Sequence, residues 1–217
     1  MSTQRNITFF YSPQTRAQVA LNLLEELGAP YELRVLNMKA GEQRQPAYLA
    51  INPMGKVPAI LDGDTLVTEQ VAIFIHLADR FPQAGLAPAL DDPLRGAYLR
   101  WLVFYAACYE PALTDRSQQR APATPMQSPY GTFDDVMNVI EAQLAQSPYL
   151  VGGKLTAADI LWGMALAWGM AFGLVPRRPV FVEYAERLCA RPAARRVAER
   201  DAALAAEHEA AVKAAQA

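Results

Sequence analysis

The sequence of 217 residues is poor in the side chains on which several kinds of site depend. It has two cysteines, Cys108 and Cys189, which lie far apart and form no Cys-x-x-Cys motif. Such usage excludes a disulfide scaffold and favours a reduced, cytoplasmic protein. The two histidines, His76 and His208, fall in separate predicted helices. We therefore expect neither a His/Cys metal site nor a Ser–His–carboxylate triad.

The chain also lacks a concentrated charge and a long apolar segment. Its net charge is −2 and no run of Lys or Arg concentrates positive charge, so nucleic acid and anionic membranes are not expected partners. The uncharged run 160–175 is shorter than the roughly 18 residues of a membrane span, and we expect a buried core helix there. The polar N-terminus, residues 1–6, is followed by no signal core. Gly152-Gly153-Lys154 lacks the flanking pattern of a phosphate loop.

The residues that are present predict a globular protein whose first eighty residues form an α/β domain. Hydrophobic residues make up 52% of the chain, and charged residues 19%. Apolar residues recur with the period of a strand in some segments and of a helix in others. Strands are expected at 7–11, 31–35, 57–61 and 65–67, and helices at 17–27, 46–51 and 69–81. The order βαβαββα predicts a mixed four-stranded sheet with 31–35 at its edge.

The rest of the chain predicts helices alone. Leu94, Tyr98, Trp101, Tyr105 and Cys108 form one helical stripe. Thr156 and Asp159 have the spacing of a capping box, with apolar neighbours placed as a hydrophobic staple. Further helices are expected at 133–144, 180–190 and 195–206. The predicted organisation is an α/β domain at 1–82, a linker at 83–91, an all-helical domain at 92–206 and a fraying tail at 207–217.

The segment 52–60 has features of a peptide-binding edge. Pro58 opens a predicted strand after a glycine turn, which makes a cis peptide bond plausible. A cis bond would turn the backbone N–H and C=O of Val57 toward an extended peptide lying beside the sheet. The alternative is an ordinary trans proline at the start of a strand.

Two predicted helix starts are further candidate sites. At the first, the free N–H groups at Thr68-Glu69-Gln70 favour an anion, while the Glu69 carboxylate can hold an ammonium. Alternatively, Glu69 only complements its own helix dipole. At the second, Ser12 and Thr15 place hydroxyls where one can donate to a sulfur anion and lower a thiol pKa. Alternatively, either hydroxyl only caps the helix.

These residues together resemble a known family. Asn52-Pro53-x-Gly55-Lys56-Val57-Pro58, followed by Leu66-x-Thr68-Glu69-Gln70-x-Ala72-Ile73, resembles the glutathione-binding core of cytosolic glutathione S-transferases. Tyr149-Leu150-x-Gly152-x-x-x-Thr156-x-Ala158-Asp159 resembles the helical-domain signature of the same family. The resemblance runs from about residue 5 to residue 200. It implies a thioredoxin-like N-terminal domain, an all-α C-terminal domain, a homodimer and no metal.

The resemblance also implies roles for individual residues. Val57 matches the position whose backbone pairs with the cysteinyl unit of glutathione, and Pro58 matches the cis-proline. Glu69 and Gln70 match the pair that binds the γ-glutamyl end. Lys56 lies where a contact near the glycyl end is common, and the same groove is flanked by Met38 and Lys39.

The thiol-activating position is less clear from the motif. Arg16 stands where beta-class members have a cysteine, which argues against a protein thiol in the chemistry. Ser12 matches the serine or cysteine that precedes proline in tau-like and omega-like members. Thr15 matches the second cysteine of a Cys-Pro-x-Cys motif, and Tyr11 lies near the tyrosine of the tyrosine-type classes. Ser12 is the preferred candidate among these three.

The implied activity is transfer of glutathione, as thiolate, to a small hydrophobic electrophile. Tyr105, Cys108 and Tyr109, with Phe104 less favoured, are candidates for the second-substrate wall, or else belong to the interhelical core. One alternative is a glutathione-dependent disulfide or peroxide reductase on the same scaffold. Another is a non-catalytic module of the same fold used for protein contacts.

Overall fold

The computed structural model describes residues 6–121 and 123–216, and these form two compact units. The first unit combines Met1–Ala84 with Pro192–Ala217, and the second is Gly85–Arg191. The expectations for the N-terminal residues 1–5, for Pro122 in the predicted loop and for Ala217 lie outside the described residues. No helix within the described ranges is both long and apolar enough to cross a membrane.

The first unit contains the predicted four-stranded sheet. Its strands are β1 (Ile7–Tyr11), β2 (Tyr31–Val35), β3 (Ala59–Asp62) and β4 (Thr65–Thr68), in the order β2-β1-β3-β4. β1 pairs parallel with β2 and antiparallel with β3, which in turn pairs antiparallel with β4. The edge position predicted for β2 is therefore confirmed.

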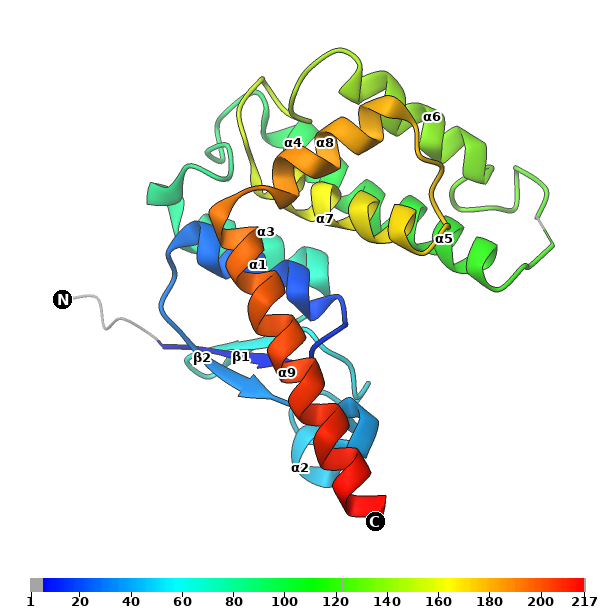
Figure 1. The fold of residues 1–217 in the computed structure, drawn as a ribbon. Coiled ribbons are helices and arrows are strands. Elements are labelled where there is room, and N and C mark those ends of the chain that lie inside the picture. The colour runs from blue at the N-terminus through cyan, green and yellow to red at the C-terminus, as the bar shows by residue number, and fades with distance from the viewer. Residues whose placement is uncertain (1–5, 122, 217) are drawn as a thin grey trace. The chain divides into compact units, whose positions relative to one another are not determined.

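Helices cover both faces of this sheet (Figure 1). α1 (Ala17–Leu27) and α3 (Gln70–Arg80) lie on one face, and α2 (Pro46–Leu49) lies on the other. α1 ends as expected at Gly28, whose left-handed φ of 60° suits a residue without a Cβ. Two short 3₁₀ turns, η1 (Met38–Ala40) and η2 (Glu42–Arg44), connect β2 to α2, and a third, η3 (Pro82–Ala84), follows α3.

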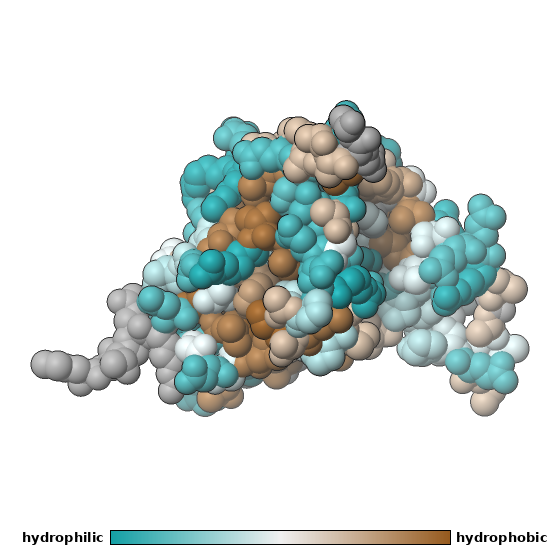
Figure 2. Space-filling view, turned by 90° about the horizontal axis from the view of Figure 1, so that it is seen from below, coloured by the Kyte–Doolittle hydropathy of each residue, from teal (hydrophilic) through white to brown (hydrophobic). Residues whose placement is uncertain are grey.

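A small apolar cluster fills the space between the sheet and α2. Phe10, Tyr48 and Ala59 are buried in it, and the rings of Phe10 and Tyr48 lie 5.5 Å apart. The partly buried residues packed against this cluster are Leu36, Ile51, Val57 and Leu61. Figure 2 shows the molecule from below, where apolar residues gather in the middle of the face and polar residues surround them.

The second unit is helical throughout its regular elements. They are α4 (Arg95–Phe104), the π-helical turn η4 (Tyr105–Tyr109), α5 (Glu110–Ser117), α6 (Phe133–Leu144), α7 (Ala157–Ala171) and α8 (Pro179–Cys189). The apolar run predicted as a core helix is confirmed in α7, whose Trp162 is fully buried. The π turn and α5 were not predicted. Pro111, the second residue of α5, cannot donate a backbone hydrogen bond to the preceding turn, which explains why the α-helical ladder is interrupted at η4.

The last helix corrects the predicted organisation. α9 (Pro192–Gln216) is one continuous helix that belongs to the first unit, whereas we had expected a helix over 195–206 in the helical domain and a fraying tail at 207–217. Its apolar stripe includes the buried Val197 and Ala205 and packs along α1 (Figure 1). Because tertiary packing rather than intrinsic propensity stabilises most helices, this contact explains the continued order.

The capping box at the start of α7 is confirmed and forms part of a larger network. Asp159 is fully buried and accepts hydrogen bonds from the Thr156 N–H and hydroxyl at 2.8 and 2.9 Å. The Leu150 N–H and the Tyr184 hydroxyl also donate to it, each at 2.8 Å. Burial raises the pKa of the Asp159 carboxyl, and these hydrogen bonds oppose that shift.

We expect Thr156→Ala to lower the free energy of unfolding by about 0.5–2 kcal/mol, because it removes the capping hydroxyl. Thermal denaturation followed by circular dichroism should show a loss of roughly 2–4 °C per kcal/mol for a chain of this size. Thr156→Ser keeps the hydroxyl and is the matched control. Equal melting temperatures for the wild-type protein and the alanine variant would contradict this expectation.

Candidate functional site

The sheet topology brings the predicted binding residues to one end of the first unit. β1 and β2 end there, β3 begins there, and β4 ends there, because Phe10 pairs with Ala59 and Ala59 pairs with Thr68. The segments that follow or precede these strand ends carry Ser12, Thr15, Met38, Lys39, Lys56, Val57, Pro58, Glu69 and Gln70. The Gln70 side-chain amide donates to the Arg16 carbonyl at 3.4 Å, which joins the start of α3 to the segment that follows β1.

Ser12 is the first residue after β1. Its side chain is nearly buried, with 2% of the residue exposed. Among the described residues, none hydrogen-bonds to its hydroxyl. This hydroxyl is therefore available to donate to a ligand at the end of the sheet.

Tyr11 and Thr15 use their hydroxyls within the protein. The Tyr11 hydroxyl donates to the Asp201 carboxylate, and burial, followed by that bond, raises the pKa of Tyr11 far above its ordinary value. The Thr15 hydroxyl donates to the Ser12 carbonyl at 2.6 Å and accepts from the Ala17 N–H at 3.2 Å. The N-cap residue of α1 is Arg16, so these bonds place Thr15 one residue before the cap, and Tyr11 is buried.

The segment before β3 carries an available backbone edge. The Val57–Pro58 peptide bond is cis, as predicted. In the part of the chain that the structure describes, the Val57 N–H and C=O take part in no hydrogen bond. The preceding Lys56 carbonyl, in contrast, accepts from the Tyr48 hydroxyl at 2.6 Å and from the Asn52 amide at 2.9 Å. These two donors fix the backbone next to Val57.

Gly55 completes this turn. Its φ of 58° is left-handed, and a Cβ there would meet the Gln43 carbonyl oxygen at 2.8 Å. Only glycine fits such a position without displacing backbone. This steric limit therefore explains why the Asn52-Pro53-x-Gly55 motif has glycine at its last position.

Glu69 and Gln70 lie at the start of α3. Glu69 is exposed, has a left-handed φ of 66° and makes no capping bond to the helix with its side chain. The first N–H groups of α3 have no intrahelical carbonyl to bond, and they lie next to the end of β4. The Gln70 side-chain oxygen is buried, and no described residue hydrogen-bonds to it. The helix start thus offers unpaired donors, an acceptor and a carboxylate together.

Met38 and Lys39 lie in η1, after β2. Asn37 caps this turn by accepting from the Ala40 N–H at 3.1 Å, and its own N–H donates to the Glu42 carboxylate at 2.7 Å. Met38 is half-buried and Lys39 is exposed. Lys56 is also exposed, on the loop before β3. The three side chains flank the same sheet end.

The residues predicted for a second-substrate wall lie mostly in the core of the helical unit. Tyr105 and Tyr109 are buried and pack against Trp162, with ring centroids 5.6 and 5.0 Å from it. The Tyr109 hydroxyl donates to the Ala165 carbonyl at 3.0 Å. Tyr105 and Tyr109 therefore lie in the interhelical core, which was the alternative to the second-substrate wall. Phe104 and Cys108 are half-buried, and burial raises the pKa of the Cys108 thiol.

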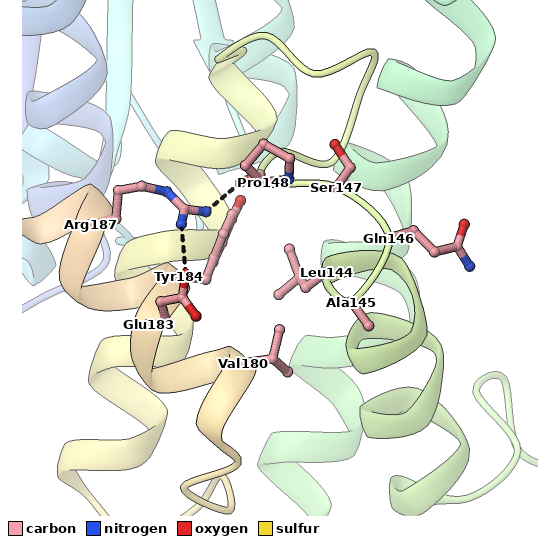
Figure 3. Close-up of a pocket in the computed structure, with 9 residues that line it drawn as sticks. All are labelled: Leu144, Ala145, Gln146, Ser147, Pro148, Val180, Glu183, Tyr184 and Arg187. Carbon is pink, nitrogen blue, oxygen red and sulfur yellow. Dashed lines mark hydrogen bonds and ion pairs between the residues drawn. The ribbon is translucent and has the colours of Figure 1, made fainter.

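One cavity in the helical unit contains none of the predicted site residues (Figure 3). Its volume is about 450 Å³, and it lies between the end of α6, the following loop and α8. The Arg187 side chain there donates to the Pro148 carbonyl and pairs with Glu183, so its charge is used within the fold. Leu144 and Val180 supply apolar lining. The cavity adds no reactive group to the site.

Sequence patterns missed three residues that support the site. Tyr48 and Asn52 hold the Lys56 carbonyl from α2 and the turn after it, which a pattern of local spacing does not indicate. Asp201 was also missed, although one signal was present. It stands on the apolar stripe of α9, between Val197 and Ala205, where a carboxylate needs a buried partner. Over the described ranges, no three His, Cys, Asp or Glu residues are grouped to hold a metal.

Comparisons with known proteins agree with this architecture. The profile of the glutathione S-transferase N-terminal domain matches residues 6–79, and that of the C-terminal domain matches residues 131–192. Glutathione S-transferase 3 of Zea mays is 30% identical over 186 residues, which cover 79% of this chain and 83% of the relative.

Solved structures of bacterial proteins are similar over nearly the whole chain. A glutathione transferase from Methylococcus capsulatus has a TM-score of 0.77 and 26% identity, and the match covers 90% of this chain and 98% of the other. A sphingomonad glutathione S-transferase complexed with glutathione has a TM-score of 0.75 and 27% identity, with the same coverage.

The fold thus defines a class, in which a thioredoxin-like domain is combined with an all-helical domain. The chain belongs to the cytosolic glutathione S-transferase family.

Proposed function

We propose that the protein is a glutathione transferase that conjugates the thiolate of glutathione to a small hydrophobic electrophile. The observation that carries this proposal is the convergence, at one sheet end, of three unpaired features. They are the Val57 backbone edge, the start of α3 and the Ser12 hydroxyl. Each of them complements a different part of an extended tripeptide thiol.

Glutathione binding follows from the first two features. The Val57 N–H and C=O pair with the cysteinyl unit as a neighbouring strand would. The γ-glutamyl carboxylate accepts from the first N–H groups of α3, where the helix dipole favours negative charge. Its ammonium pairs with the Glu69 carboxylate, and Gln70 contributes its buried oxygen. Lys56, Met38 and Lys39 lie near the glycyl end.

Activation of the thiol follows from the third feature. A free thiol has a pKa near 8.5, so most of it is protonated at pH 7. Lowering that pKa by about two units, or about 2.7 kcal/mol, makes the thiolate the main species. The Ser12 hydroxyl donates to the sulfur anion and supplies part of this shift. The thiolate then attacks an electrophilic carbon, forming a C–S bond as the leaving group departs or a ring opens.

A calorimetric titration with glutathione is the first test. Binding is expected with the native protein, and its absence would favour a non-catalytic module and refute the proposal. A panel of glutathione with a haloarene, an epoxide and a mixed disulfide then compares transferase with reductase activity. A rate confined to the disulfide would assign the protein to the reductase alternative.

Cys108→Ser is expected to leave the rate of conjugation within about twofold of wild type. The Cys108 thiol is mostly protonated at pH 7, because burial raises its pKa, and only the thiolate is a nucleophile. The matched control is Cys189→Ser, because burial also raises the pKa of the Cys189 thiol. Steady-state rates with the haloarene measure both variants. Loss of all activity in Cys108→Ser alone would indicate a cysteine mechanism instead.

Assembly and location are proposed from the family. We propose that the protein is a homodimer, because family members typically dimerise. We also propose that it is cytoplasmic, because both of its cysteines are free thiols. Sedimentation equilibrium tests the dimer, and a mass of one chain at micromolar concentration would refute it. Cell fractionation tests the compartment.

A further inference from the structure

Asp201 is a buried carboxylate on the helix that returns to the first unit. Only 6% of the residue is exposed, and its neighbours on the same stripe of α9, Val197 and Ala205, are buried and apolar. A carboxylate in such surroundings is costly unless it receives hydrogen bonds. The groups that donate hydrogen bonds to Asp201 therefore show which segment of the protein this carboxylate anchors.

The hydrogen-bond donors to this carboxylate come from the last residue of β1 and from the loop that follows it. The Tyr11 hydroxyl donates to Oδ1. The Gln14 backbone N–H donates to Oδ1 at 3.1 Å and to Oδ2 at 3.3 Å. Both partners lie in the segment 11–16, which contains Ser12 between them. Asp201 thus ties both sides of Ser12 to α9.

The backbone at Gln14 needs such a tie. Its φ of 58° is left-handed, a conformation that residues with a Cβ adopt only where their surroundings hold them. Thr15, the next residue, donates from its hydroxyl to the Ser12 carbonyl at 2.6 Å. A shift of Gln14 is therefore passed through Thr15 to Ser12, whose hydroxyl is the proposed thiol donor.

We propose that Asp201 is a positioning residue, which fixes the loop 11–16 so that the Ser12 hydroxyl meets the glutathione sulfur. This inference rests on the proposed function. In this role Asp201 acts through Tyr11 and Gln14, whose hydrogen bonds it accepts. The helix α9 thereby contributes to thiol activation in the first unit.

The test compares Asp201→Ala with Glu199→Ala, which removes an exposed carboxylate from the same helix. Thiolate absorbance against pH gives the pKa of bound glutathione, and initial rates give KM for each substrate. Asp201→Ala should raise the thiol pKa by about one unit, because a misplaced hydroxyl loses its alignment with the sulfur, while KM for glutathione near pH 6 should change little. KM for the electrophile and both values in Glu199→Ala should stay as in wild type.

Loop anchoring is measured separately, without ligand. Hydrogen exchange of the Gln14 amide should be slow in the wild-type protein and in Glu199→Ala, and fast in Asp201→Ala. If Asp201→Ala does not fold, Asp201→Asn replaces it. The asparagine side chain offers one amide oxygen as acceptor in place of two carboxylate oxygens. We therefore expect smaller increases in the thiol pKa and in the exchange rate of the Gln14 amide.

The outcomes separate the two proposals. If the wild-type protein binds no glutathione, the proposed function fails and the positioning role fails with it. If it binds glutathione but Asp201→Ala, or the asparagine variant in its place, leaves the thiol pKa unchanged, only the positioning role is overturned. The same holds if exchange at Gln14 is unchanged. A raised thiol pKa together with faster exchange supports it.

Discussion

Ser12→Ala is expected to raise the pKa of the bound glutathione thiol by about one to two units, because a hydrogen bond to a charged group contributes roughly 1.5–3 kcal/mol. The hydroxyl of this residue is nearly buried and has no partner among the described residues. Removal of it leaves the sulfur anion without its donor, while the Val57 edge and the start of α3 remain. Glutathione binding near pH 6 should therefore change little.

The measurement is the thiolate absorbance of the complex against pH, with conjugation rates at pH 6.5 and 9. The rate deficit of Ser12→Ala should be largest at pH 6.5 and shrink at pH 9, where the thiol ionises without help. Thr15→Ala is the comparison, since the Thr15 hydroxyl is bonded to the Ser12 carbonyl. An unaltered titration in Ser12→Ala with a raised pKa in Thr15→Ala would transfer the role to Thr15.

Glu69→Ala is expected to weaken glutathione binding by about 1.5–3 kcal/mol, the cost of leaving an ammonium without its charged partner. In affinity this is roughly a tenfold to 150-fold increase in Kd. Glu69 is exposed at the start of α3, and its carboxylate makes no capping bond to its own helix. The side chain is therefore not held by a capping bond, and the binding measurement decides between an ammonium partner and the alternative in which Glu69 only complements its helix dipole.

Calorimetric titration measures this loss, and two further variants identify its cause. Glu69→Gln keeps the size of the side chain but removes its charge. Because the ammonium needs that charge, Kd for glutathione should rise nearly as much as in Glu69→Ala. Asp64→Asn removes an exposed carboxylate in the β3–β4 turn and should bind as wild type does. Equal Kd values for wild type, Glu69→Ala and Glu69→Gln would remove Glu69 from the site.

The sequence predicted the sheet and most helices because their signals are local. The apolar alternation of Ile7, Phe9 and Tyr11 and the glycine after α1 depend on neighbours within one element. α6 was predicted at its observed bounds, and the capping box gave the start of α7. The segments of the proposed glutathione site were indicated by short motifs that lie next to strand ends.

The features that were missed depend on contacts between distant residues. Tyr11 was a candidate activator because it lies near the tyrosine of the tyrosine-type classes, yet its hydroxyl donates to Asp201, 190 residues away along the chain. The extent of α9 was missed because alanine-rich sequence gives no sign of the α1 surface on which it packs. Tyr105 and Tyr109 have a helical spacing that fits a wall or a core equally, and only their contacts with Trp162 distinguish the two.

The return of α9 to the first unit has a consequence for biosynthesis. Chains emerge from the ribosome N-terminus first, and domains generally fold as units in that order. Here the first unit is not complete until Pro192–Ala217 has been synthesised, after the whole of the second unit. The first loop of the nascent sheet therefore receives the Asp201 carboxylate only after the second unit and α9 have been synthesised.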